Sequence, residues 1–178
     1  MMTKSIAHLV LIAAIAVASQ NGLASEASPQ SRNEQINANV KALAAAQMRV
    51  LNRAAAFCSN SQLPPGRPLD QRLTSYIEAF SIGTAAGMNE IASTDTNNDI
   101  LSPIPAHNKM DIEMMDKQGD IFLKAVQSSP ERGCKKLSEL FDAGSIDSFK
   151  NTTLQNYQEY KIKRLKYCSK EPKPKNCE

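Results

Sequence analysis

Cysteine is the residue type in this sequence whose number and placement most clearly predict chemistry. The four cysteines are Cys58, Cys134, Cys168 and Cys177, and no two of them form a Cys-x-x-Cys motif. The sequence therefore does not support a thioredoxin-type redox site or covalent haem attachment. An even number of cysteines in an exported chain is typical of structural disulfides, so we expect two disulfide bonds.

Histidine limits the catalytic options, because His107 is the only histidine after the N-terminal leader described below. A Ser-His-Asp or Cys-His arrangement would have that single candidate base, and the sequence contains no Gly-x-Ser-x-Gly motif. A metal site built from several histidines is excluded for the same reason. We interpret His107 as a solvent-exposed residue of a proline-rich loop.

One acidic segment partly matches a calcium-binding loop. Asp95, Asn97 and Asp99 fit the first three ligand positions of an EF-hand loop. Ile100 replaces the glycine of the sharp turn, and Ala106 replaces the bidentate glutamate. We therefore interpret this segment as a polar turn, and we expect neither a metal nor a cofactor.

A second acidic group lies in 109–128, where Asp116 and Asp120 are four residues apart on one helical face. Paired carboxylates can transfer protons when the environment raises the pKa of one of them. Lys117 and Lys124 alternate with these acids, which indicates a solvated face instead. A hydrolase that acts on an envelope substrate through these carboxylates is therefore an alternative hypothesis, and not the first one.

Basic residues gather near the end of the chain. Residues 150–178 hold eight basic and three acidic side chains, whereas 25–149 hold twelve basic and fifteen acidic ones. Such a patch predicts an anionic partner: an acidic protein, an anionic envelope polymer or lipid headgroups. A purely structural role stays open, because cations stabilise the C-terminal end of a helix. The patch consists of Lys161, Lys163, Arg164 and Lys166, interleaved with Tyr157 and Tyr160.

Residues 1–24 have the pattern of a cleavable signal peptide. Lys4 precedes an apolar stretch, 6–18, that is too short to span a bilayer. Small residues at the −3 and −1 positions predict cleavage after Ala24, with Ala18 as the second choice. No later segment is apolar enough to cross a membrane. The mature protein is thus expected in the periplasm or outside the cell, without a nucleic acid partner.

Composition and apolar spacing predict a single all-α domain. Aromatic residues make up 5% of the chain and tryptophan is absent, so aliphatic side chains, methionine and alanine must fill the core, which suits close-packed helices. The polar segment 25–32 is expected to be disordered, and 169–178 to form an extended tail. Long loops, two of them rich in proline, separate the helices of a disulfide-stapled bundle in 33–168. The five predicted helices are 33–58, 69–92, 109–128, 130–142 and 146–168.

Several residues are expected to shape these helices. Gln47 interrupts the apolar seam of the first helix. Ser129 is expected to cap 130–142 with its hydroxyl, and Gly144 to end that helix in the left-handed conformation. Ile162 and Leu165 are assigned to the apolar face of the last helix.

Gly83 and Gly87 lie four residues apart on the apolar face of 69–92. Each glycine costs about 1 kcal/mol inside a helix, so a compensating contact is expected. Close approach of a neighbouring helix is the first interpretation. The alternative is a small apolar ligand on this flat surface, which would make the protein a carrier.

The order of the helices suggests which cysteines pair. If consecutive helices alternate in direction, Cys58 ends the first helix at the pole where Cys134 lies. The last two helices would then return Cys168 to the same pole. We therefore predict the disulfides Cys58–Cys134 and Cys168–Cys177.

Together these features favour a small exported binding protein over an enzyme. We expect it to dock on another envelope or secreted protein as an inhibitor, an immunity protein or an accessory factor. A structure distinguishes the alternatives, because a hydrolase requires the acids of 109–128 to converge in a cleft. A carrier requires an open pocket beside Gly83 and Gly87.

Overall fold

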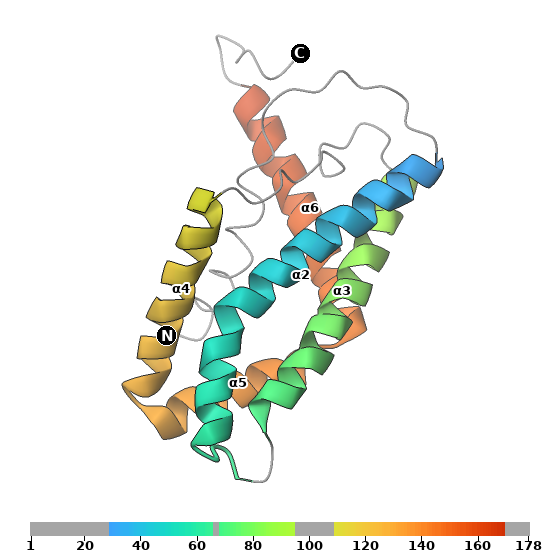
Figure 1. Cartoon of the computed structure of the whole chain (residues 1–178). Helices are drawn as coiled ribbons and strands as arrows, with labels where there is room; N and C mark the ends of the chain where they lie inside the picture. The colour runs from blue at the N-terminus through green and yellow to red at the C-terminus, as the bar shows by residue number, and fades with distance from the viewer. Residues whose placement is uncertain (1–28, 66–67, 95–108, 170–178) are drawn as a thin grey trace.

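The protein is a bundle of α-helices, as predicted (Figure 1). The computed structural model describes residues 29–65, 68–94 and 109–169, and no strand occurs among them. Apart from the start of the first one, the helix ends lie within two residues of the predicted positions. The helices are α2 (Pro29–Asn60), α3 (Leu69–Thr94), α4 (Lys109–Gln127), α5 (Pro130–Ala143) and α6 (Ile146–Cys168).

The first described helix starts earlier than expected. α2 begins at Pro29, so the prediction of disorder is wrong for 29–32, while 25–28 lie outside the described residues. Proline is favoured at a first helical position, because it has no amide hydrogen to leave unpaired. Arg32 then donates a hydrogen bond of 3.1 Å to the carbonyl oxygen of Ala92, near the C-terminal end of α3. A cation is stabilised at that end by the helix dipole, which favours helix in this polar segment.

The arrangement centres on α2, which packs against α3 and α4, while α6 packs against α3. The short helix α5 crosses one end of the bundle and contacts α2, α3 and α4 (Figure 1). Because α5 does not run back along the bundle, α6 starts beside the middle of α3, where Ile146 meets Gly83, and finishes at the end opposite to α5. Cys168 therefore lies far from Cys58 and Cys134, and the expectation that it shares their pole is wrong.

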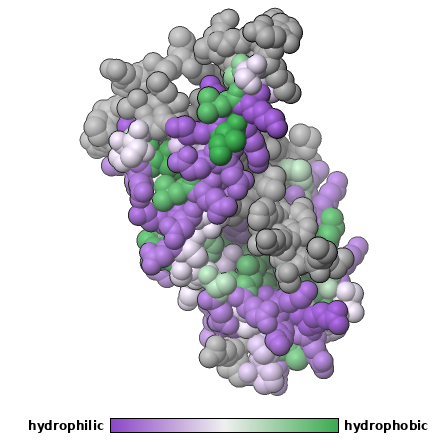
Figure 2. Space-filling view, turned by 180° about the vertical axis from the view of Figure 1, so that it is seen from behind, coloured by the Kyte–Doolittle hydropathy of each residue, from purple (hydrophilic) through white to green (hydrophobic). Residues whose placement is uncertain are grey.

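Two groups of buried residues form the core. The larger group joins α2, α3, α4 and α5 through side chains such as Leu51, Leu73, Val126 and Leu137, and the smaller one joins the first half of α2 to the last turns of α3. Gln47 lies in the buried stripe of α2 with 6% of its surface exposed. Its Oε1 has no hydrogen-bond partner in the described part of the chain, so the predicted interruption of the seam is confirmed. Hydrophilic residues cover much of the outer face in Figure 2.

α2 ends in a Schellman turn, which reverses the chain toward α3. Gln62 adopts a φ of 53°, in the left-handed region. The amide of Leu63 donates to the carbonyl of Cys58 at 2.9 Å, and the amide of Gln62 donates to the carbonyl of Ser59 at 3.0 Å. Leu63 then packs against the larger core. These two hydrogen bonds satisfy carbonyl groups that the end of the helix would leave unpaired.

The ends of α5 differ from the predicted caps. The hydroxyl of Ser129 makes no capping hydrogen bond. Gly144 has φ −76° and ψ 101°, which is extended and not left-handed. Glycine is favoured at this position for a different reason: a Cβ there would lie 2.7 Å from Cε2 of Tyr76, which is too close. The turn between α5 and α6 thus rests directly on the Tyr76 ring.

Candidate interaction surface on helix α6

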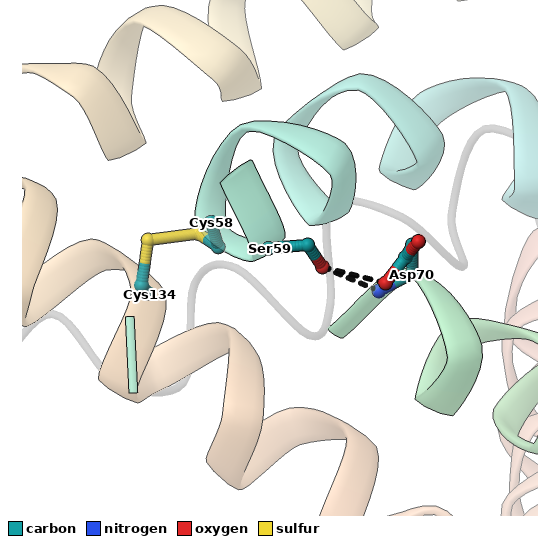
Figure 3. Close-up of a disulfide and its surroundings, with 4 residues drawn as sticks. All are labelled: Cys58, Ser59, Asp70 and Cys134. Carbon is teal, nitrogen blue, oxygen red and sulfur yellow. Dashed lines mark hydrogen bonds between the residues drawn. A yellow bond between two sulfur atoms is a disulfide. The ribbon is translucent and has the colours of Figure 1, made fainter. Parts of the chain in front are cut away.

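A disulfide joins α2 to α5 at the end of the bundle that α5 crosses (Figure 3). It links Cys58 to Cys134, the predicted pair, with the two Cα atoms 5.5 Å apart. Both residues are fully buried. The bond spans 76 positions of sequence, and in the chain-entropy model such a loop stabilises the fold by about 4.5 kcal/mol. Cys177 lies outside the described residues, so the Cys168–Cys177 bond stays a prediction.

Beside the disulfide, a polar contact joins the end of α2 to the start of α3. Ser59 Oγ donates to Asp70 Oδ1 at 2.7 Å and accepts from the amide of Asp70 at 3.0 Å (Figure 3). The hydrogen bond from Ser59 lowers the pKa of the Asp70 carboxyl below its ordinary value. The contact fixes the approach of the two helices. It does not create a catalytic acid, because the carboxylate is held in its charged form.

The acidic pair of α4 serves to bind α2. Asp116 Oδ1 lies 2.8 Å from Arg49 Nε and 3.7 Å from Arg53 Nη2. Asp120 forms an ion pair with Arg53 as well. Gly119 lies between these acids and faces the backbone of α2, where a Cβ would be 3.4 Å from the carbonyl oxygen of Arg49, an ordinary van der Waals contact. The acids stay on a solvent-exposed face, as predicted, where they pair with arginines of α2 instead of converging in a cleft, so the arrangement does not support acid–base catalysis.

Gly83 and Gly87 mark the crossing of α3 and α6. A Cβ on Gly83 would collide with the carbonyl oxygen of Ile146 and lie 2.8 Å from Cβ of Phe149. A Cβ on Gly87 would lie 2.8 Å from Cβ of Thr153. The flat surface is thus covered by α6, so the helix-crossing interpretation is confirmed and the ligand interpretation is wrong at this position.

An ion pair beside the same crossing also joins α3 to α6. Lys150 Nζ of α6 lies 2.7 Å from Oε2 of Glu90 on α3. The hydrogen bond and the charge of Glu90 raise the pKa of Lys150. Both side chains are partly exposed, so the pair contributes little to stability and serves mainly to define how the two helices align.

An aromatic cluster anchors the start of α6. The ring centroid of Tyr76 lies 5.1 Å from that of Phe141 and 5.2 Å from that of Phe149, and Phe80 lies 5.3 Å from Phe149. Burial raises the pKa of Tyr76 to about 12. Edge-to-face contacts of this kind add to the stabilisation from burial. Helices α3, α5 and α6 are therefore held together at one place, at the first turns of α6.

The last turns of α6 are placed differently, because they extend past the ends of α3 and α4 (Figure 1). Ile162 is 65% exposed and Leu165 is 70% exposed. Their assignment to a buried face was wrong, because α6 passes beyond the helix that would have covered them. Figure 2 shows hydrophobic surface surrounded by hydrophilic atoms at this end of the molecule.

The predicted basic patch lies along the same turns. Tyr157 is buried and stacks with Tyr160, with ring centroids 6.5 Å apart. Lys161 Nζ lies 5.5 Å from the Tyr157 ring centroid, at cation–π distance, and Arg164 donates to the Tyr160 hydroxyl at 3.4 Å. Two tyrosines and an arginine thus form the inner face of α6. Lys161, Lys163 and Lys166 are exposed and surround the apolar pair.

Comparison of the chain with protein-family models, with curated proteins and with solved structures finds no match.

Two further findings concern the described residues alone. No group of three or more histidine, cysteine, aspartate or glutamate residues in 29–65, 68–94 and 109–169 could hold a metal ion. No helix in these ranges combines the length and the hydropathy needed to cross a bilayer. His107 and the segment 95–99 lie outside the described residues, and so do residues 1–24.

Proposed function

We propose that the protein is exported and acts by binding another protein, and not by catalysis. The observation that carries the proposal is the exposure of two large aliphatic side chains, Ile162 and Leu165, at the end of a helix that extends from the bundle. Burying such a side chain at an interface removes apolar surface from water and is a common source of binding energy. We expect the role of an inhibitor, an immunity protein or an accessory factor.

The surroundings of the groups that could do chemistry support binding over catalysis. Asp116 and Asp120 are engaged by arginines of α2, and Cys58 is bonded to Cys134. A catalytic pair of carboxylates would need to share a cleft shielded from water, whereas the side chains of Asp116 and Asp120 are 41% and 50% exposed. No observation on the described residues favours the hydrolase hypothesis.

Two features support export. A buried disulfide between distant segments is typical of proteins that fold in an oxidising compartment. Residues 1–24 have the charge, length and small-residue pattern of a signal peptide. Mass spectrometry of the native protein is expected to find an N-terminus at Ser25 and no free thiol. An intact leader together with reduced Cys58 and Cys134 would contradict export.

The binding proposal is tested by cross-linking the protein in the cells that make it. We expect a covalent product that contains this chain and a second, different protein, and a complex of the same composition on native size-exclusion chromatography. A chain that stays monomeric in cross-linked cells, or that cross-links only to other copies of itself, would overturn the proposal.

A further inference from the structure

We propose that the last two turns of α6 are the docking surface, and that the partner is a protein with an apolar pocket bordered by carboxylates. Ile162 and Leu165 enter the pocket, and the neighbouring lysines face its acidic border. This inference rests on the proposed function, since it names the surface through which the protein binds its partner.

The two faces of α6 beyond the crossing have different roles. Tyr157, Tyr160 and Arg164 recur at spacings of three and four residues and interact with one another, so they share one face. Ile162 and Leu165 lie on the other face, three residues apart, and are more than half exposed. The two apolar side chains are therefore adjacent and point away from the face that is engaged within the molecule.

The charge around this pair indicates an acidic partner. Lys161, Lys163 and Lys166 are exposed on the same turns. The acid on these turns is Glu159, and Lys163 Nζ lies 3.8 Å from its Oε2. The surface is therefore an apolar pair with a positive border, which complements an apolar pocket with a negative one. Charges at such a border mainly accelerate association, and salt weakens their effect.

The extent of the apolar surface favours a protein over a membrane. A helix that lies in a membrane interface needs an apolar face that continues over several turns. The preceding outward positions of α6 are Gln155, Gln158 and Glu159, which are polar and exposed. The apolar area is thus about one turn long, which suits a pocket on a folded partner.

The described contacts that hold α6 in place lie in its first half, at Phe149, Lys150 and Thr153. Replacing exposed residues after that half is therefore expected to leave the fold intact. Ile121 of α4 provides a matched control, because it is also isoleucine and is 68% exposed. If I162A weakens binding and I121A does not, the loss of affinity belongs to this surface and not to exposed isoleucine in general.

The test has two stages and uses the full chain in the cells that make it. A photo-reactive phenylalanine derivative is placed at position 158, which borders the apolar pair, in one variant and at position 121 in another, and the cross-linked protein is identified by mass spectrometry. The partner is then purified, and its affinity is measured for the wild type, I162A, L165A, I121A and the double variant K163E/K166E, which leaves Lys161 over the Tyr157 ring. Vesicles that contain 30% phosphatidylglycerol serve as a second probe.

We expect cross-linking from position 158 and not from 121. I162A and L165A are expected to weaken binding about tenfold or more, with I121A unchanged, as for anchor residues at the centre of an interface. The double variant should slow association and reduce its dependence on salt. If a partner is captured but I162A and L165A bind it as the wild type does, this inference is wrong and the proposed function stands. If neither position captures a protein, this inference is wrong, and the proposed function is wrong with it only when general cross-linking of the cells also yields no complex. Binding to the vesicles that depends on Ile162 and Leu165 would then replace the protein partner with a membrane surface.

Discussion

Ser59 and Asp70 form a reciprocal pair, in which the Ser59 hydroxyl donates to the Asp70 carboxylate at 2.7 Å and accepts from the Asp70 amide at 3.0 Å. The pair joins the end of α2 to the first turn of α3, one residue away from the buried disulfide. The hydrogen bond stabilises the charged carboxylate in the folded state, so the pKa of Asp70 is lower there than in the unfolded chain.

This shift predicts how stability depends on pH. The unfolded chain binds a proton at Asp70 at a higher pH than the folded protein does, so the contribution of this pair is complete above the ordinary pKa of 3.8. It is lost as the pH falls below 3.8 through the lowered folded-state pKa. Asp70→Asn and Ser59→Ala should each flatten the acid limb of the stability curve, measured by urea unfolding between pH 2.5 and 6. Acid limbs parallel to that of the wild type in both variants would contradict the prediction.

The surroundings of Gly83, at the crossing of α3 and α6, and of Gly119, between α4 and α2, predict opposite effects for two glycine substitutions. Gly83→Ala should lower the free energy of unfolding by about 1–3 kcal/mol, because the new Cβ would meet the backbone carbonyl of Ile146 and Cβ of Phe149. Gly119→Ala is the matched control, since its Cβ would find its nearest neighbour at 3.4 Å, an ordinary contact. There the better helix propensity of alanine should raise stability by up to about 1 kcal/mol. Thermal and chemical unfolding of both variants measure the difference, and equal effects would show that the crossing is not closely packed.

Tyr76 predicts a loss of stability in alkali. Its pKa is raised to about 12 by burial, so above pH 10 the unfolded chain releases a proton that the folded protein retains. Stability therefore falls as the pH rises from 10 to 12, by at most roughly 3 kcal/mol from this group. Tyr76→Phe should remove this part of the decline, and absorbance at 295 nm should show one tyrosine fewer in the late-titrating fraction. A late-titrating tyrosine that persists in Tyr76→Phe would assign the effect to another residue.

Much of the fold could be predicted from the sequence, because the signals that carry it are local. Pro130 after Ser129 and Gly144 before Ser145 mark helix ends in the sequence itself, and the apolar spacing of each helix lies within one segment. Gly83 and Gly87 also form a local signal. Two glycines on one apolar helical face cost helix stability, so the pair predicts a closely packed neighbouring helix. The pairing of Cys58 with Cys134 followed from helix direction over the first four helices.

The features that could not be predicted depend on contacts between distant segments. Nothing local in Asp116 indicates that Arg49, 67 residues earlier, will pair with it. The path of α5 across the end of the bundle decides where α6 finishes, and hence that Ile162 and Leu165 are exposed. Their spacing is that of a buried helical face, and only the path of α6 past the end of α3 shows that no described helix covers them.

Gln62 predicts a stabilising substitution at the end of α2. Its φ of 53° lies in the left-handed region, where side chains with a Cβ are strained and glycine is not. Gln62→Gly keeps the amide that donates to the Ser59 carbonyl and should raise stability by about 0.5–1 kcal/mol, after the entropy cost of glycine in the unfolded chain. The control is Asn60→Gly, at the last helical residue of α2, where glycine should lower stability instead. A decrease of similar size in both variants would mean that the strain at Gln62 is negligible.

Replacing the buried amide of Gln47 by an apolar side chain is expected to raise the stability of the protein. The side chain is 6% exposed, and its Oε1 has no hydrogen-bond partner in the described part of the chain. A buried acceptor without a partner costs roughly 1–3 kcal/mol, because it loses its hydrogen bonds to water on folding. Gln47→Met has a similar length and flexibility and no carbonyl, so it should raise the free energy of unfolding by about 1 kcal/mol. Gln47→Ala separates the two effects, since it removes the carbonyl but leaves a cavity and should be less stable than Gln47→Met. A Gln47→Met variant less stable than the wild type, measured by urea unfolding at neutral pH, would mean that the Oε1 atom is satisfied in solution.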